Sequence, residues 1–221
     1  MKSKTQIMVV ILVTIVGIGI PVLVSANGAT PALLIVKDPG ADPYIIPEDT
    51  DGVPSWGENA TLSVNVTNVT GMPEIGEVTV NLSAIGGSAK TYMSLIGNYT
   101  DGSTFNYVTN ASAGTANWNG SAYVPHYLQV NASDATDPAN RTYNTSVSIG
   151  LLVMKNGDVN VDGDTTFSDA MYLYKWKAGK PGFDTIYETI ADVNGDGNTT
   201  FSDAMYLYKW KAGKPGFDVL R

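Results

Sequence analysis

The sequence predicts a mostly β protein, in which a β-sandwich is followed by a small α-helical domain with two EF-hand-type calcium loops. Three observations lead to this prediction. A block of sequence near the C-terminus is written twice with almost no change. The stretch before it alternates apolar and polar residues in short runs separated by turn-forming residues, a pattern typical of sandwich strands. The chain contains no cysteine, which excludes disulfides and thiolate metal sites.

The first 26 residues are predicted to be a secretory signal peptide. Lys2 and Lys4 precede an apolar run over residues 7–24, and Ser25 and Ala26 supply small residues before the expected cleavage point. This is the order of a signal sequence, so we expect the mature protein to be secreted and associated with the cell surface. An uncleaved membrane anchor is the alternative, because the run is long enough to span a bilayer. Membrane contact is expected only in that case.

Residues 27–155 are predicted to form one immunoglobulin-like β-sandwich domain of about seven strands. Period-two alternation marks half-buried strands, and ranges 32–36 and 91–96 are further strand candidates. Turns are expected at residues 49–52, 86–87 and 99–102. The alternating apolar positions are Leu62, Val64 and Val66; Val78, Val80 and Leu82; Leu128 and Val130; and Val147, Ile149, Leu151 and Val153.

The segment VTVNLSAIGGS, residues 78–88, resembles the immunoglobulin-like modules of secreted archaeal surface proteins. The resemblance implies an archaeal surface protein and brings no active site with it.

Asn-x-Ser/Thr sequons are concentrated in the same region. Residues 59–146 contain twelve asparagines and ten of them begin a sequon, whereas the local content of serine and threonine would give about three by chance. Several alternate with buried positions and so face solvent. Glycosylation is the prediction, and a polar exterior without sugars is the alternative. The sequon asparagines are Asn59, Asn65, Asn68, Asn81, Asn98, Asn110, Asn119, Asn131, Asn140 and Asn144.

Charge and residue usage argue against several functions. The formal net charge is −8 and no basic stripe occurs, so nucleic acid is not an expected partner. His126 is the only histidine, and no cysteine nucleophile exists. The candidate carboxylates for a glycosidase-type pair lie in turn-rich sequence or at a strand start, so we predict a non-catalytic protein. These carboxylates are Glu48, Glu58, Glu74 and Glu77.

The duplicated block occupies residues 158–183 and 192–217, an offset of 192 − 158 = 34 residues, and the copies differ only at Val161/Gly195 and Asp164/Asn198. Oxygen-bearing residues fall at places one, three, five, seven, nine and twelve, and glycine at place six, as in an EF-hand loop. We therefore predict two bound Ca²⁺ ions. The predicted ligands are Asp158, Asn160, Asp162, Asp164, Thr166 and Asp169, and then Asp192, Asn194, Asp196, Asn198, Thr200 and Asp203.

Each loop runs into one helix only, predicted over residues 169–178 and 203–212, with glycine just beyond as a C-terminal stop. A duplicated loop–helix with aspartate at place twelve resembles the dockerin domain, over about residues 156–221. The resemblance implies a calcium-folded domain that docks onto a cohesin module of another protein. It also implies that recognition residues lie at places ten and eleven. The sequence departs from the dockerin pattern at Thr165, Thr199, Lys177 and Lys211.

The two helices are rich in aromatic residues, and two short helices can bury only one face each against the other. Either all the aromatics form the core, or a surplus face waits for a partner. The candidate partner-binding residues are Phe167, Ser168, Tyr174, Phe201, Ser202 and Tyr208.

Three assemblies follow from this organisation. In the first, the dockerin-like domain binds a cohesin-type module of another protein at the cell surface. In the second, the protein is a structural subunit of an extracellular filament or surface layer, where the dockerin-like domain packs on the sandwich of the next copy. In the third, the two domains pair within one chain and calcium only stabilises them.

Overall fold

This computed structural model describes residues 12–13, 22–23, 34–68, 75–100, 102–135 and 147–221. A short antiparallel pair, β1 (Leu12–Val13) and β2 (Val22–Leu23), comes first. Apart from these strands, the predicted signal peptide lies outside the described residues. Among the helices that are described, none has the length and apolar character needed to cross a membrane.

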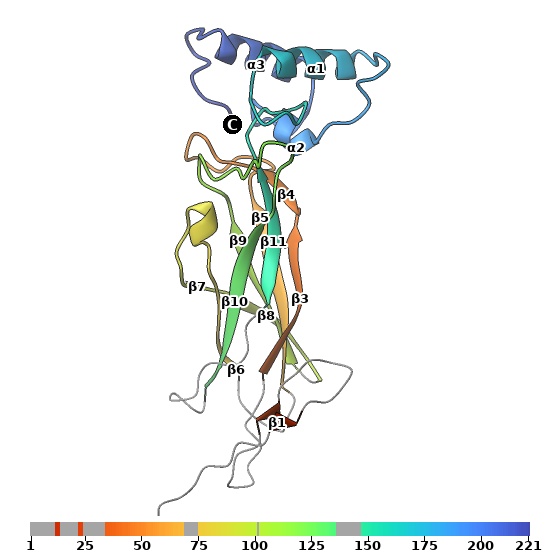
Figure 1. The fold of residues 1–221 in the computed structure, drawn as a ribbon. Helices are drawn as coiled ribbons and strands as arrows, with labels where there is room; N and C mark the ends of the chain where they lie inside the picture. The colour runs from red at the N-terminus through yellow and green to blue at the C-terminus, as the bar shows by residue number, and fades with distance from the viewer. Residues whose placement is uncertain (1–11, 14–21, 24–33, 69–74, 101, 136–146) are drawn as a thin grey trace, which may run out of the picture.

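Two packed sheets follow, as predicted for a mostly β chain (Figure 1). The first sheet has the order β4-β11-β10-β6-β7 and the second β3-β5-β9-β8. All neighbours are antiparallel except β4 and β11. This strand order is that of an immunoglobulin sandwich. The strands are β3 (Leu34–Asp42), β4 (Ile45–Pro47), β5 (Ala60–Asn68), β6 (Ile75–Val80), β7 (Thr91–Tyr92), β8 (Ser94–Tyr99), β9 (Gly102–Thr109), β10 (His126–Asp134) and β11 (Ser148–Met154).

The sandwich core is built from the alternating positions that the sequence marks. Leu62, Val64 and Val66 of β5 are fully or almost fully buried, and so are the inward residues of β6, β10 and β11. Leu82 is also buried but lies just past β6, before a 3-10 turn, η1 (Ser83–Ile85). Gly86 closes this turn with φ 85°, a left-handed conformation that favours glycine.

The two sheets of the sandwich hold nine strands in the described residues, against about seven predicted. Sequence analysis did not identify β4 or β9. β4 is three residues long and ends in Pro47. β9 reads GSTFNYVT, and its buried residues are only Phe105 and Thr109, so it lacks a row of apolar residues.

Three helices form the C-terminal end: α1 (Phe167–Lys177), α2 (Glu188–Ala191) and α3 (Phe201–Lys211). α1 and α3 pack side by side at the end of the molecule remote from the sandwich, and α2 lies between them and the sandwich (Figure 1). Their shared core is small, and its buried members are Val159, Ala170, Leu173, Ala191, Val193, Ala204, Leu207 and Leu220.

The long helices begin two residues earlier than predicted. Thr166 and Thr200 are the N-caps, and each forms a capping box with Asp169 or Asp203, which satisfies amides that would otherwise be unpaired. The single turn of α2 was not predicted, because four residues carry no helical periodicity.

A third apolar cluster joins the sandwich to the helical domain. Tyr123 and Met154 from the sandwich are buried with Ile190 of α2, and Trp118 packs against them. The chain passes from the end of β11 at Met154 to the first loop at Asp158 with only residues 155–157 between them. We call the region where Trp118, Tyr123 and Met154 of the sandwich meet α2 and the first loop the junction.

Candidate functional site

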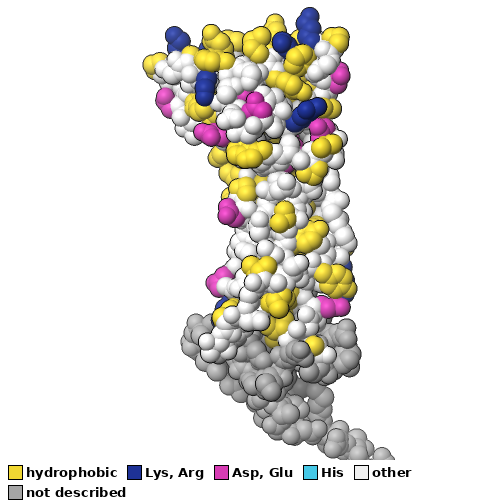
Figure 2. Space-filling view, turned by 180° about the vertical axis from the view of Figure 1, so that it is seen from behind, with side chains coloured by type: hydrophobic (Ala, Val, Ile, Leu, Met, Phe, Trp, Pro, Cys, Tyr) yellow, Lys and Arg dark blue, Asp and Glu magenta, His cyan; other side chains and the backbone are white. Residues whose placement is uncertain are grey.

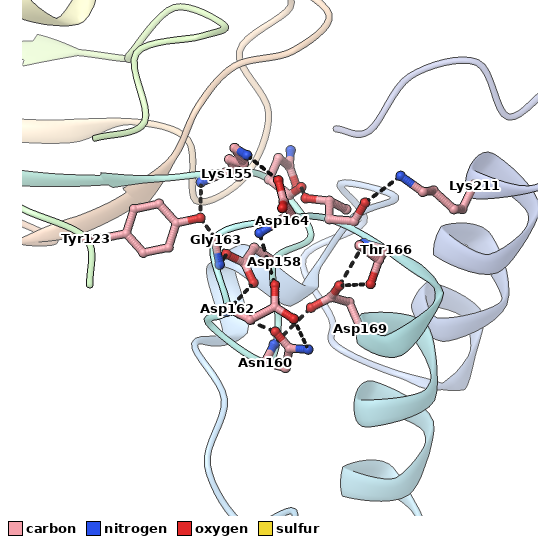
Figure 3. Close-up of polar contacts among 12 residues, drawn as sticks. Tyr123, Lys155, Asp158, Asn160, Asp162, Gly163, Asp164, Thr166, Asp169 and Lys211 are labelled. Atoms are coloured by element: carbon pink, nitrogen blue, oxygen red, sulfur yellow. Dashed lines mark hydrogen bonds and ion pairs between the residues drawn. The ribbon is translucent and has the colours of Figure 1, made fainter. Parts of the chain in front are cut away.

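The first loop, residues 158–169, is held in shape by hydrogen bonds from its backbone amides to its own side chains (Figure 3). Asn160 Oδ1 accepts a hydrogen bond from the amide of Asp162 at 3.0 Å, and Asp162 Oδ1 accepts one from the amide of Asp164 at 3.0 Å. Asp158 accepts from the amides of Asp162 and Gly163. Gly163, at place six, has φ 93°, so the sharp turn needs glycine there.

Asp169 closes the loop from the first turn of α1. Its two carboxylate oxygens accept hydrogen bonds from the amides of Asn160 at 3.0 Å and Thr166 at 2.8 Å. The side chains at places one, three, five and twelve therefore all accept hydrogen bonds from backbone amides of the same loop. These bonds close the segment 158–169 into a compact loop.

The second loop repeats this arrangement. Asp192 accepts from the amides of Asp196 and Gly197, and Asp203 accepts from those of Asn194 and Thr200. Gly197 has φ 84°. The same sequence gives the same loop twice.

Burial of four aspartates is the observation that favours a cation. Asp158, Asp169, Asp192 and Asp203 are at most 1% exposed. None of the ion pairs found in the described residues involves them. Burial raises the pKa of Asp169, Asp192 and Asp203, because a carboxylate anion loses solvation there. Buried anions without a counter-charge are costly, and a hard cation would remove that cost.

The donor set of each loop fits calcium, since it combines carboxylate, amide, hydroxyl and backbone oxygens. Within the described residues, no three acidic or histidine side chains are close enough to form an all-acid metal cluster. Binding would therefore use the mixed set predicted from the sequence. Thr166 and Thr200, at place nine, also act as helix N-caps.

The sandwich contributes a residue that sequence analysis missed. The hydroxyl of Tyr123 donates a hydrogen bond to Asp158 Oδ2 at 2.5 Å and accepts one from the amide of Lys155 (Figure 3). Burial, and then the bond to Asp158, raise the pKa of Tyr123 well above its usual range, so it remains a donor. No local pattern could reveal this contact, because the partners are 35 residues apart.

The aromatic residues of the helices do not all belong to the core, since they divide into a half-buried set and an exposed set. Tyr172, Trp176, Tyr206 and Trp210 pack against the small core. A second set is 44–50% exposed. We call it the aromatic face, and its members are Phe167, Met171, Tyr174, Phe201, Met205 and Tyr208.

The aromatic face consists of two equivalent halves. The ring of Phe167 on α1 contacts Tyr208 on α3 with centroids 5.2 Å apart, and Tyr174 contacts Phe201 at 5.2 Å. Each half therefore takes one ring from each helix. Ser168 and Ser202 are exposed beside them, and their hydroxyls contact Asn160 and Asn194.

The departures from the dockerin pattern contact one another. Lys177 Nζ donates to the carbonyl of Thr199 at 2.8 Å, and Lys211 Nζ donates to that of Thr165 at 2.8 Å. These matching bonds tie the end of each helix to the loop of the other copy, while the hydroxyls of Thr165 and Thr199 donate to the carbonyls of Asn156 and Glu188.

Lysines lie at the C-terminal ends of the two helices that carry the aromatic face. α1 and α3 each carry two lysines in the last turn and a third follows in the turn beyond, while the acidic residues of both helices are the buried Asp169 and Asp203. Figure 2 shows hydrophobic, basic and acidic side chains over this end of the molecule. A complementary surface would be apolar at its centre and acidic at its rim.

The remaining candidate groups have structural partners. His126 Nε2 lies 2.7 Å from the carbonyl oxygen of Thr115. Glu48 accepts from the amides of Gly114 and Ala116. Glu77 pairs with Lys90 and Glu58 is buried. Glu74 lies outside the described residues.

Among the sequons, Asn59, Asn98, Asn119 and Asn131 are exposed, and Asn65, Asn81 and Asn110 are half-buried. Asn110 donates its amide to the buried Asp49 at 2.8 Å, so its nitrogen already has a structural role. Asn68 ends β5. Asn140 and Asn144 lie outside the described residues.

Fold and site together define an immunoglobulin-type sandwich that carries a duplicated, calcium-loop helical domain. Residues 156–209 match the family model described as "Dockerin type I domain", so this part of the chain is a dockerin-type domain. Dockerin domains are non-catalytic modules that bind calcium and dock to cohesin modules, typically in extracellular, cell-surface proteins.

Other comparisons add little. The comparison with curated proteins found no match. Among solved structures, the alkylpurine DNA glycosylase AlkC of Pseudomonas fluorescens, bound to DNA containing an abasic site analog, is 14% identical with a TM-score of 0.26. The match covers 56% of this chain and 31% of that one. A similarity this low carries no argument about fold or function.

Proposed function

We propose that this protein is a secreted, non-catalytic surface protein whose dockerin domain, folded around two Ca²⁺ ions, docks onto a cohesin-type module through the aromatic face. The exposed aromatic face carries the proposal. Six large apolar side chains are about half exposed on α1 and α3, the two helices that form the end of the molecule remote from the sandwich (Figure 1). Contiguous apolar patches of this kind typically mark interaction surfaces.

Calcium would be held by the residues at places one, three, five, seven, nine and twelve of each loop. When bound, it supplies positive charge to carboxylates that are otherwise buried without a cation. The loops also set the N-termini of α1 and α3, since Asp169 and Asp203 are both loop residues and capping residues. Ion binding would therefore fix the angle between the helices and so the spacing of the two halves of the face.

Calorimetric titration of the mature protein with purified cohesin modules, in calcium and in chelator, tests this proposal. We expect binding in calcium only. Tyr174→Ala combined with Tyr208→Ala should weaken it by at least ~2 kcal/mol, if these residues are anchors. Tyr127→Ala is the matched control, because Tyr127 is 70% exposed on the sandwich. Equal loss in the control, or binding that ignores calcium, would contradict the proposal.

Pairing of the domains within one chain is favoured over head-to-tail assembly. The end of the sandwich is covered by this chain's own dockerin domain through Tyr123, Met154 and Ile190. A next copy could not use that end without displacing it. The oligomeric state of the mature protein in calcium distinguishes these assemblies: a monomer supports the proposal, and calcium-dependent filaments support the structural alternative.

Processing follows from the same proposal. We expect cleavage after Ala26 and N-linked sugars on the exposed sequons Asn59, Asn98, Asn119 and Asn131. Attachment at Asn110 would sacrifice its hydrogen bond to Asp49. Intact mass of the native protein decides both points, since a mass equal to the bare chain from Asn27 would retract the sugars.

A further inference from the structure

The two loops are almost identical in sequence but have different surroundings. Asp158 in the first loop accepts a hydrogen bond from Tyr123 of the sandwich at 2.5 Å. The hydrogen bonds found for the carboxylate of Asp192 in the described structure come from loop amides alone. The two loops can therefore be compared within one molecule. The sandwich donates a hydrogen bond to a predicted ligand residue of the first loop, Asp158, but not to its counterpart Asp192 in the described structure.

Trp118 strengthens this difference. A Cβ atom added at Gly163 would lie 2.4 Å from the indole ring of Trp118, whereas one added at Gly197 would lie 3.8 Å from Trp56. Trp118 also packs edge-on against Tyr123, with ring centroids 5.0 Å apart. The turn of the first loop is thus covered by an aromatic pair from the sandwich.

The two copies differ at two positions, and at each position one of the two residues contacts a part of the chain outside its own loop. These residues are Asp164 in the first copy and Gly195 in the second. Asp164 pairs with Lys155 at 2.8 Å, while its counterpart Asn198 bonds to the carbonyl of Asp196 within its own loop. Gly195 is half-buried, and a Cβ there would lie 3.1 Å from Arg221 and 3.3 Å from Ser55.

Place four explains the second difference. Its backbone is left-handed in both copies, with φ 58° at Val161 and φ 69° at Gly195. Valine is strained in this region, yet it occurs in the first loop, where it is 36% exposed. Glycine occurs in the second loop, where a side chain would be crowded by Ser55 and Arg221. The crowding at the junction therefore favours glycine in the second loop but not in the first.

Further bonds hold the C-terminus at the same place. Thr50 Oγ1 donates to the carbonyl of Leu220 at 2.6 Å, and Arg221 lies 3.7 Å from Asp51. The junction therefore involves both loops, α2 and the chain end.

We propose that the sandwich completes the first calcium site from outside the loop, with Tyr123 as its positioning residue, so that calcium binding in this loop and rigid docking of the two domains are one coupled event. This inference rests on the proposed calcium binding. Outer partners that orient a ligand raise metal affinity, so the first site should bind calcium more tightly than the second. A partner on the aromatic face would then be held at a fixed angle to the sandwich.

Site-resolved calcium titration of the full mature chain tests the coupling. The amides of Gly163 and Gly197 report on the two loops separately by NMR in one sample. We expect Tyr123→Phe to weaken calcium binding at the first loop by about tenfold and to leave the second unchanged. The second loop is therefore the internal control.

Three results would overturn the inference. Tyr123→Phe could leave the first site unchanged, could weaken both sites equally, or could tighten the first site, which would mean that the hydroxyl competes with the ion. In each case calcium still binds, so the proposed function stands. Absence of calcium binding in the unsubstituted chain would remove both.

A pair of exchanges at place four tests the junction independently. Gly195→Val should force Ser55 and Arg221 apart, so that the two domains tumble separately in NMR relaxation measurements with calcium present. Val161→Gly makes the opposite exchange at an exposed position and should leave joint tumbling intact. Separate tumbling in the unsubstituted protein with calcium would overturn rigid docking, whereas joint tumbling in Gly195→Val would overturn the steric account of place four.

Discussion

Buried aspartates are the residues on which the dockerin domain depends. Each loop buries one carboxylate at its first place and one at its twelfth. Within the part of the chain that the structure describes, their donors are backbone amides, a helix-cap hydroxyl and, at Asp158, the hydroxyl of Tyr123. Burying such a group as an anion is costly without a nearby cation. We therefore expect calcium to stabilise the fold as well as to bind as a ligand.

Removing one first-place carboxylate should remove one ion. We expect Asp158→Ala and Asp192→Ala each to lower calcium stoichiometry from two to one in calorimetry, and the double variant to bind none at millimolar calcium. Asp184→Ala is the control, since Asp184 is exposed outside both loops. A double variant that still binds two ions would place the metal elsewhere.

Glu58 gives the sandwich its own pH dependence. It is fully buried, Oε1 has no hydrogen-bond partner, and Oε2 accepts from the amide of Ser55 at 2.6 Å. Burial raises its pKa above the usual value. A raised carboxyl pKa contributes stability that is present below the unfolded pKa, near 4.3, and is lost as pH rises through the folded pKa.

Glu58→Gln should remove this dependence. We expect urea denaturation of the variant to show a sandwich more stable than the original at pH 7, by roughly 1 kcal/mol, with the difference vanishing in acid below the unfolded pKa. Glu77→Gln, at an exposed residue paired with Lys90, should change stability little. A variant that is less stable at pH 7 would show that the charged form of Glu58 is needed.

The roles of individual residues could be predicted only where a fixed spacing along the sequence indicates them. The loop positions follow from a fixed ring of oxygen donors with glycine at its sharp turn, so sequence alone identifies Asp158 and Asp169 as its ends. Tyr123 and Trp118 meet the first loop only because the sandwich ends beside it. Such a contact depends on the tertiary fold and leaves no periodic trace in the sequence.

At the scale of helices, α1 and α3 are related by an approximate two-fold. The ring pairs Tyr172 with Phe183 and Tyr206 with Phe217 both have centroids 5.0 Å apart, and the lysine bonds to Thr199 and Thr165 are equal. The aromatic face inherits this symmetry, so its two halves should be equally attractive to a partner.

Pairs of substitutions can test whether a partner needs one half of the aromatic face or both halves. Phe167→Ala with Tyr208→Ala destroys one half, because these rings contact each other. Phe167→Ala with Phe201→Ala damages both. If a cohesin module needs one half at a time, the first pair should cost about 0.4 kcal/mol, the statistical factor of two, and the second at least ~2 kcal/mol. Equal losses would mean that the partner covers the whole face.

Helices and strands were predictable to the extent that they repeat or alternate. The core strands β5, β6, β10 and β11 have clear period-two patterns, and the two helices follow from a repeated motif. The helix starts were misplaced because Thr166 and Thr200 combine a loop position with an N-cap. β9 was missed because its cross-strand neighbours, β5 and β8, hold it in the sheet through backbone pairing.

The whole molecule is two cores of unequal size joined at one end. The sandwich core is continuous across both sheets, whereas the dockerin core consists of a few side chains between α1 and α3. Small domains without disulfides depend on a metal for stability, so the two parts should respond differently to chelation. Loss of the dockerin fold should also affect the sandwich at the junction, because Tyr123 and Met154 of the sandwich contact the first loop and α2.

Chelation should therefore melt the dockerin domain and leave the sandwich folded. We expect circular dichroism to show loss of the helical signal in chelator, while the β signal and a cooperative thermal transition remain. The sandwich transition should also move to lower temperature, since the apolar surface of Tyr123, Met154 and Trp118 would lose its cover. Tyr123→Phe in calcium should retain the helices, because its ring still packs against Trp118. If chelation unfolds the sandwich together with the helices, the two cores form one cooperative unit, and the sandwich could not act as an independent spacer.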